Sequence, residues 1–209
     1  MFAPFAIHRL LREDPSLFAT LVGFMYKRDD NAVDPTQESM DEKTRQKLAH
    51  NARSVVDSWR LLPGVNDDGS VDENQLTQWV DAARAQCAVS RHVTGGDIQL
   101  GFVLARMPRD RDGTWPHTAV RNLIERLNND VIDQHIQIEV FNSRGVVSRG
   151  LLDGGAQEKA LADGYRKMGE AVQARWPRTA ALLRQLANSY SRYAEHEDIE
   201  SELNDLRLG

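Results

Sequence analysis

The chain has 209 residues, of which 41% are hydrophobic and 27% charged. This composition is typical of a folded protein with a sizeable core and excludes a disordered chain. The net charge of −5 argues against a protein that attracts nucleic acid or anionic membranes over its whole surface, although a local basic site stays open.

The first part of the chain predicts helices that begin at polar caps. Residues 4–12 fit a short helix. Asp14-Pro15 then predicts a helix start, because aspartate accepts from free amides and proline fits the first helical position. A polar loop is expected over 27–35. Ser39 and Glu42 have the spacing of a capping box and predict the start of the next helix.

Turns rich in glycine and proline divide the middle of the chain. Pro63-Gly64 and Asp68-Gly69 predict a turn, after which Asp72 caps a helix. Gly95-Gly96 predicts a break followed by a short helix capped by Asp97. A further helix is expected to open at Thr114-Trp115-Pro116.

Residues 131–141 fit two structures. Val131, Ile132 and His135 have helical spacing, whereas Ile136, Ile138 and Val140 alternate as in a strand. We favour a helix, with a β-hairpin across 136–151 as the alternative. The glycine-rich residues 142–155 predict a long loop, and such loops are often functional.

Two helices are expected to end the chain, one from Leu161 to Trp176 and one that begins at Pro177. The last residues, 191–209, hold six acidic residues against two arginines and predict a solvated, frayed helix end. The whole pattern predicts a mainly α fold, an irregular bundle of about eight or nine helices. We treat 1–209 as a single domain, with a possible boundary near 30–39.

The sequence contains no clear catalytic, metal-binding or nucleotide-binding motif. If Gly69 held the sixth position of a calcium loop, Gly64 and Gln75 would occupy the first and twelfth positions, and neither supplies a carboxylate. No two of the six histidines are four residues apart, and Cys87, the single cysteine, falls on an apolar helix face. Phosphate-loop, nucleophile-elbow and dinucleotide fingerprints are missing. We therefore predict no catalytic residues, metal ligands or cofactor.

The segment 142–150 is the most unusual part of the sequence and the candidate ligand site. Asn142, Ser143, Arg144 and Arg149 combine an amide, a hydroxyl and two guanidinium groups, which suit phosphate or carboxylate. Other loops could contribute Arg106, Arg109 and Arg111. A purely structural role, with Arg144 paired to an internal acid, is the favoured reading. Nucleic acid is less supported still, because no aromatic residues interleave with the basic ones.

Two further hypotheses concern single side chains. Trp115, between a turn and a proline, is the tryptophan expected to be exposed for contact with a partner. An enzyme whose site is assembled from distant residues is a second alternative, for instance with His135, Asp133 and Ser143.

A set of motifs resembles the C-terminal region of very large bacterial proteins that are usually labelled hypothetical. In chain order they are Ser58-Trp59-Arg60, Pro63-Gly64 with the turn Asp68–Asp72, Asp112–Pro116, Asn142–Val146, Gly154–Glu158 and Trp176–Ala180. The resemblance would cover about residues 14–193. It implies that the chain is part of a larger protein, by analogy one in defence or signalling, and it implies no catalytic residue.

The expected function is a non-enzymatic interaction module, acting as a sensor, scaffold or assembly domain. Its partners would be another protein or other domains of a longer chain, and its oligomeric state stays open. The lone cysteine and the lack of a secretory signal or a long apolar run predict a cytoplasmic protein without a membrane anchor.

Overall fold

The computed structural model describes residues 4–143 and 155–208, with side chains described for 6–143 and 155–199. These residues form nine helices and one isolated bridge between Val65 and Val71. The helices are α1 (Pro4–Glu13), α2 (Pro15–Met25), α3 (Glu42–Ser58), α4 (Glu73–Val89), α5 (Val93–Ala105), α6 (Thr118–Leu127), α7 (Asp130–Asn142), α8 (Ala156–Val172) and α9 (Pro177–Leu208). The predicted mainly α bundle is confirmed. Residues 136–142 are helical, as favoured, and most of the rest of the alternative hairpin lies outside the described residues.

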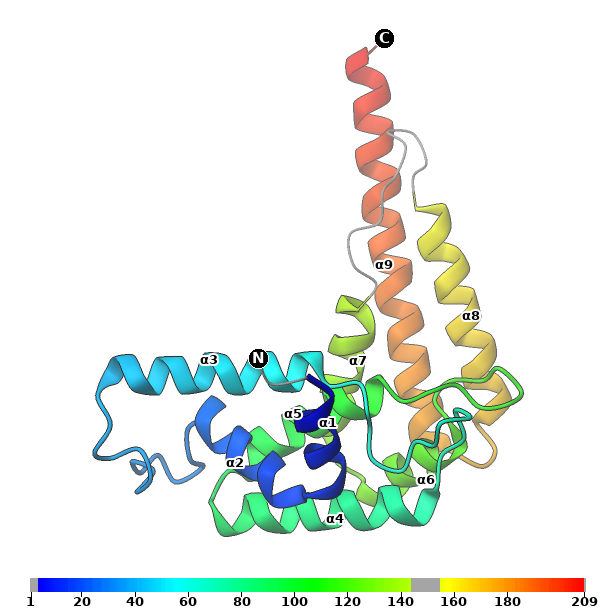
Figure 1. Ribbon diagram of the computed structural model, residues 1–209. Coiled ribbons are helices and arrows are strands. Elements are labelled where there is room, and N and C mark those ends of the chain that lie inside the picture. Colours follow the sequence, from blue (N-terminus) through cyan, green and yellow to red (C-terminus); the bar gives the residue numbers. More distant parts are fainter. Residues whose placement is uncertain (1–3, 144–154, 209) are drawn as a thin grey trace.

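The molecule consists of a broad base and a projecting helical hairpin (Figure 1). Helices α1 to α6 build the base, whereas α8 and α9 pack along each other and stand out from it, with α7 beside α9. The hairpin is unequal, because α8 has 17 residues and α9 has 32. One end of α9 is therefore anchored in the base and the other extends beyond α8.

Polar caps start several helices, as the sequence predicts. Asp14 accepts from the amide of Ser16 at 2.8 Å, and Asp72 accepts from that of Gln75 at 3.0 Å. The predicted capping box is wrong in detail. The cap of α3 is Asp41, which accepts from both the amide and the hydroxyl of Thr44 at 2.9 and 2.8 Å. A carboxylate that takes two bonds at this position replaces the proposed serine.

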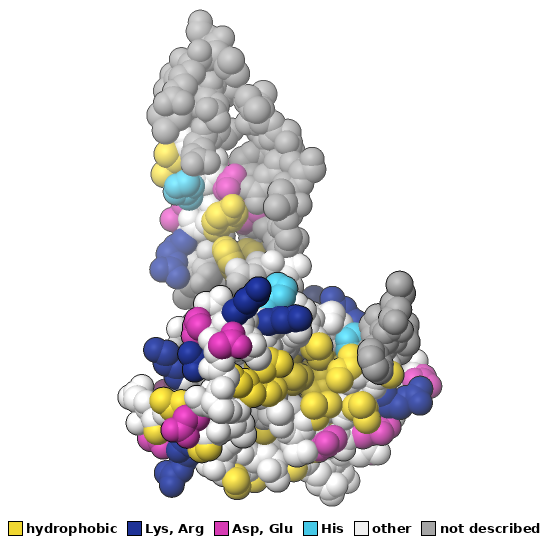
Figure 2. Space-filling view, turned by 60° about the vertical axis from the view of Figure 1, so that its left-hand side comes forward, with side chains coloured by type: hydrophobic (Ala, Val, Ile, Leu, Met, Phe, Trp, Pro, Cys, Tyr) yellow, Lys and Arg dark blue, Asp and Glu magenta, His cyan; other side chains and the backbone are white. Residues whose placement is uncertain are grey.

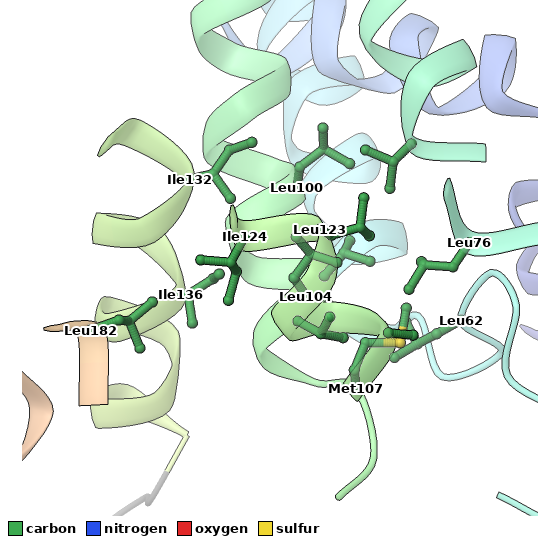
Figure 3. Packing of buried hydrophobic residues seen from close by; sticks show 14 of the residues in the cluster. Leu62, Leu76, Leu100, Leu104, Met107, Leu123, Ile124, Ile132, Ile136 and Leu182 are labelled. Carbon is green, nitrogen blue, oxygen red and sulfur yellow. The ribbon is translucent and has the colours of Figure 1, made fainter. Parts of the chain in front are cut away.

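A continuous hydrophobic core joins the base to the hairpin. Within it α5, α6, α7 and α9 meet through Leu100, Leu104, Leu123, Ile124, Ile132, Ile136 and Leu182 (Figure 3). Phe18, Trp59 and Trp79 form an aromatic cluster in the base, with ring centroids 5.2 to 6.5 Å apart. Trp59 and Trp79 thus have the core role expected of them.

Gly95-Gly96 does not break the chain, which corrects the prediction. Both residues lie in the first turn of α5, where a Cβ on Gly95 would sit 2.7 Å from the Tyr26 ring and one on Gly96 would sit 2.7 Å from Cys87 Sγ. The glycines therefore serve close packing of α5. Asp97 is not a cap but a buried partner of Arg84 on α4, at 2.8 Å.

Two other helix boundaries differ from the prediction. α6 begins at Thr118, after Trp115-Pro116, because Asp110 and His117 accept from the first free amides of the helix. α8 ends at Val172 and so does not reach Trp176, whose indole N–H donates to Asn122 at 2.7 Å. Pro177 begins α9, as predicted, and the acidic tail continues this helix to Leu208.

The face shown in Figure 2 presents hydrophobic side chains over α2. This helix has no charged residue, and its outward positions Leu17, Leu21 and Phe24 stay half-buried while Phe18 and Val22 fill the core. The described part of the projecting hairpin carries hydrophobic, basic, acidic and histidine side chains in the same view. The molecule therefore has apolar surface both on the base and on the projection.

Candidate interaction groove

A groove of about 670 Å³ runs between α7 and α9 where the hairpin leaves the base. α7 contributes Gln134, Gln137, Ile138, Phe141 and Asn142, and α9 contributes Leu186, Ser189, Arg192, Tyr193 and His196. The residues from each helix recur at intervals of three or four, so each set forms one stripe along its helix. The groove is thus made by two helix faces, not by loops.

The groove exists because α7 is apolar on two sides. Ile132 and Ile136 point into the core and are 1% and 0% exposed. Ile138 and Phe141 lie on the neighbouring face, and Ile138 is 36% exposed. The strand-like alternation in the sequence arises from these two faces, because residues two apart on a helix point in different directions.

Aromatic rings build one wall of the groove. The ring of Phe141 lies 5.2 Å from that of Tyr190 and 5.8 Å, edge to face, from that of Tyr193. Tyr190 is buried and stacks on Tyr165 of α8 at 5.6 Å, whereas Tyr193 is 40% exposed. The wall is therefore fixed to the core on one side and open to solvent on the other, as in many binding surfaces.

Charged groups lie at the edge of the groove and not on its floor. Arg192 is exposed and forms no ion pair within the described part of the chain. Glu195 is also exposed and lines an adjoining polar cleft together with Arg192. On the α7 side, Gln137 donates to Gln185 at 2.7 Å. The groove thus combines an apolar floor with a polar rim, a pattern that is also found in protein interfaces.

The predicted ligand segment is only partly described. Asn142 lines the groove, and Ser143 caps the end of α7 by donating its hydroxyl to the carbonyl of Val140 at 3.1 Å. Arg144 and Arg149 lie outside the described residues, so a phosphate or carboxylate site there stays a prediction. Arg106 has a structural role, since it pairs with Glu139 at 2.7 Å and donates to the carbonyl of Val56 at 2.9 Å.

Arg109 and Arg111 lie away from the groove. Both line a cleft of about 400 Å³ between the 66–71 turn and the loop before α6, together with Asp68, Asp110 and His117. Hydrogen bonds from Thr118 lower the pKa of Asp110, and those from Ser70 lower the pKa of Asp68. The carboxylates are therefore already held by the chain's own donors, and charges of both signs line this cleft.

Trp115 is buried, which corrects the expectation of an exposed ring. It is 6% exposed and packs edge to face on Tyr165 of α8, with ring centroids 6.2 Å apart. The backbone amide of Trp115 also lies 3.5 Å from Sδ of Met168, another residue of α8. A role in partner contact stays a prediction.

The residues of the enzyme hypothesis do not converge. Asp133 pairs with Arg178 at 2.6 Å, His135 Nδ1 bonds the carbonyl of Val131 in its own helix, and Ser143 bonds Val140. Burial raises the pKa of Asp133 to about 6, although Arg178 opposes this shift. Each side chain has a local structural partner, and these three do not assemble a proton-transfer site.

The remaining titratable candidates also have structural surroundings. Burial raises the pKa of Cys87 to about 12, which keeps this buried thiol protonated and unreactive. His92 is fully buried, and its Nε2 lies 3.9 Å from Asp34. Among the described residues, no group of three or more histidine, cysteine or acidic side chains is placed to hold a metal ion.

Comparisons with known proteins add no relative. No family model, no curated protein and no solved structure matches the chain. Among the helices whose residues are described, none has the length and apolar character needed to cross a membrane. The groove is therefore interpreted from its own geometry.

Sequence reasoning identified only one lining residue, Asn142, and missed the rest. The available signal was the pair of apolar faces within 131–141, which we read as a choice between helix and strand. The α9 stripe was less visible, because Ser189, Arg192 and His196 are polar. Only the crossing of two helices gives these residues a common surface.

Proposed function

We propose that this chain is a non-enzymatic helical protein-interaction module, a sensor, scaffold or assembly domain of a larger bacterial protein, and that it binds a partner in the α7–α9 groove. One observation carries the proposal: the described residues form an apolar groove with a polar rim between two helices that are otherwise fixed in the core. Large exposed apolar side chains in a concave site favour protein binding.

The α7–α9 groove supports this function better than the other surfaces do. The cleft between α1 and α4, about 870 Å³ in volume, is lined by charges of both signs, namely Arg9, Arg12, Glu13 and Asp67. The α2 face has half-buried apolar positions but is not hollowed into any of the described clefts. In the groove, Ile138 and Tyr193 combine exposure with a concave setting.

The groove resembles the sites that accept an amphipathic helix. Such sites offer two packed helix faces into which the partner inserts apolar residues at intervals of three and four. Ile138, Phe141 and Tyr193 would contact such residues, and the amides of Gln134 and Gln137 would contact the rim. The resemblance of its motifs to those of large bacterial proteins supports the further proposal that the chain works within a longer polypeptide.

A capture experiment with matched variants tests the proposed function. Ile138→Asp places a charge on the groove, whereas Val89→Asp places one on an apolar side chain that is 79% exposed at the end of α4. We expect proteins recovered from the source cells to be lost with Ile138→Asp and kept with Val89→Asp. Both variants should keep the helical circular dichroism spectrum. Recovery of the same proteins with all three chains would contradict the proposal.

A further inference from the structure

We propose that the cleft between the 66–71 turn and the loop before α6 binds a small molecule that carries a terminal phosphate group. Arg109, Arg111 and the imidazole of His117 hold the phosphate oxygens. The cleft shares no lining residue with the α7–α9 groove, so the site is independent of the proposed function.

Two turns form the walls of this cleft, which has a volume of about 400 Å³. In the 66–71 turn, the amide of Asn66 donates to the carbonyl of Ser70 at 2.9 Å. In the loop before α6, the amide of Asp110 donates to the carbonyl of Thr114 at 2.9 Å. Both walls are therefore held by bonds of their own, and the volume is within the range of small-molecule sites.

His117 supplies a donor whose position is fixed by the cap of α6. Its Nδ1 lies 3.1 Å from the amide nitrogen of Ala119. A backbone amide can only donate, so Nδ1 accepts and the ring proton is on Nε2. Nε2 lies 3.9 Å from Asp110 Oδ1, which is beyond hydrogen-bond distance. The Nε2–H group can therefore donate to a ligand in the cleft.

Arg109 and Arg111 supply positive charge, and neither forms an ion pair within the described part of the chain. Nη1 of Arg109 donates to the carbonyl of Gly113 at 3.1 Å and contacts Met168 Sδ at 3.9 Å. Its Nε and Nη2 thus stay available. Arg111 is exposed and lines the same cleft. Two guanidinium groups with spare donors suit a phosphate with two negative charges.

The two carboxylates of the cleft are held by donors of the chain itself. Asp110 accepts from the amide of Thr118 at 3.1 Å and from its hydroxyl, and it lies 3.8 Å from the buried guanidinium of Arg121. Asp68 accepts from the amide and the hydroxyl of Ser70 at 2.9 and 2.6 Å. The negative charge of Asp110 is therefore compensated from behind, whereas the donors of the cleft keep free N–H groups.

These donors favour a phosphate over a carboxylate. A phosphate monoester has a charge of about −2 and three terminal oxygens, so it can use both arginines and the imidazole together. A carboxylate has one charge and two oxygens in a plane, which a single arginine satisfies. The rest of the cleft accommodates the organic group of the ligand.

Isothermal titration calorimetry of the full chain with phenyl phosphate tests the site, in a phosphate-free buffer at pH 8. We expect saturable binding of one molecule per chain. Dimethyl phosphate, a diester like the backbone of nucleic acid, should bind at least fivefold more weakly because it has a single charge. Acetate should bind at least tenfold more weakly.

Paired arginine variants place the binding in this cleft. Arg109→Gln with Arg111→Gln should weaken phenyl phosphate binding at least tenfold. The matched control, Lys47→Gln with Arg53→Gln, removes the same charge at exposed positions of α3 and should leave binding unchanged.

Two single variants test the other contacts. His117→Asn keeps a side-chain acceptor for the amide of Ala119 but lacks Nε2–H, so binding should weaken at least threefold while the melting temperature stays near that of the parent. Asp68→Ser keeps an acceptor for the amide of Ser70 but removes a negative charge from the cleft, so binding should become at least twofold tighter.

Several outcomes would overturn the phosphate site. These are no saturable binding of phenyl phosphate to the parent chain, or unchanged binding to the double arginine variant. Acetate that binds as tightly as phenyl phosphate would show unspecific anion attraction, and dimethyl phosphate that does so would show recognition of a diester. Either result would overturn the assignment to a phosphate monoester.

Discussion

Gly101 sets how closely α5 approaches α7. A Cβ at this position would lie 2.6 Å from Cβ of His135 and 2.7 Å from the carbonyl oxygen of Ile132. Neither atom belongs to a flexible side-chain end, so the helices would have to move apart. This contact also fixes the side of α7 that faces away from the core and lines the groove.

We therefore expect Gly101→Ala to lower the free energy of unfolding by about 1–3 kcal/mol, the usual cost of overpacking. Gly164→Ala on α8 is the matched control, because nothing lies within 4 Å of its added Cβ. Alanine should raise stability there by about 0.5–1 kcal/mol through helix propensity. Urea unfolding of both variants measures the difference. A Gly101→Ala protein as stable as the parent would show that α5 and α7 do not pack this closely.

At the scale of elements, Arg178 connects the start of α9 to α6 and α7. Its guanidinium pairs with Asp133 at 2.6 Å and with Asp130 at 2.5 Å, and its amide donates to Glu125 at 3.1 Å. The junction holds the base of α9 at the angle from which the groove opens. Asp133 is the buried member, with its side chain 14% exposed.

Removal of the cation leaves the Asp133 carboxylate buried without its partner. We expect Arg178→Gln to cost about 2–3 kcal/mol at pH 8, less than a fully buried broken ion pair because Arg178 and Asp133 are partly exposed. Arg184→Gln, on the same helix but exposed, should cost under about 0.5 kcal/mol. Adding Asp133→Asn to the Arg178→Gln variant should recover part of the lost free energy of unfolding, because the buried charge is then removed. Chemical unfolding of the single and double variants measures the coupling free energy between Arg178 and Asp133.

The loss from Arg178→Gln should depend on pH. Burial already raises the pKa of Asp133 to about 6 in the folded protein. A carboxyl group whose pKa is higher in the folded than in the unfolded state binds its proton more tightly in the folded state. The free energy of unfolding therefore rises as the pH falls through the folded-state pKa. The cost of the variant should thus be smaller at pH 5 than at pH 8. An equal cost at both values would mean that Asp133 does not carry the effect.

At the scale of the whole molecule, the base and the hairpin share one core. Among the α9 residues whose side chains are described, which end at Ile199, Ala194 is the last that is buried, and α8 begins level with Asp198. We therefore expect the last residues of α9 to be separable from folding.

Deletion of residues 199–209 should change the free energy of unfolding by less than about 1 kcal/mol, because the terminal residues of a chain usually add little stability. Deletion of 190–209 is the contrasting variant, since it removes the buried Tyr190 and Ala194 and should destabilise the fold. A large loss of stability from the shorter deletion would show that these last residues pack within the chain.

The sequence by itself determined the mainly helical fold and several of its boundaries. Asp14-Pro15, Asp72 and Pro177 mark helix starts through local bonding and backbone geometry, which act within a few residues of the chain. The apolar faces of α4 and α9 likewise follow from spacing alone.

Tertiary structure decided what local rules could not. The sequence predicts a chain break at Gly95-Gly96, but in the structure Tyr26 and Cys87 pack closely against these glycines. The sequence also predicts an exposed Trp115, but in the structure Tyr165 covers its ring. The α7–α9 groove is also a feature that local sequence rules do not predict. Its walls are separated by more than 40 positions of the chain and meet only through tertiary packing. A cavity between two elements depends on their crossing angle and distance, and no single segment encodes those quantities.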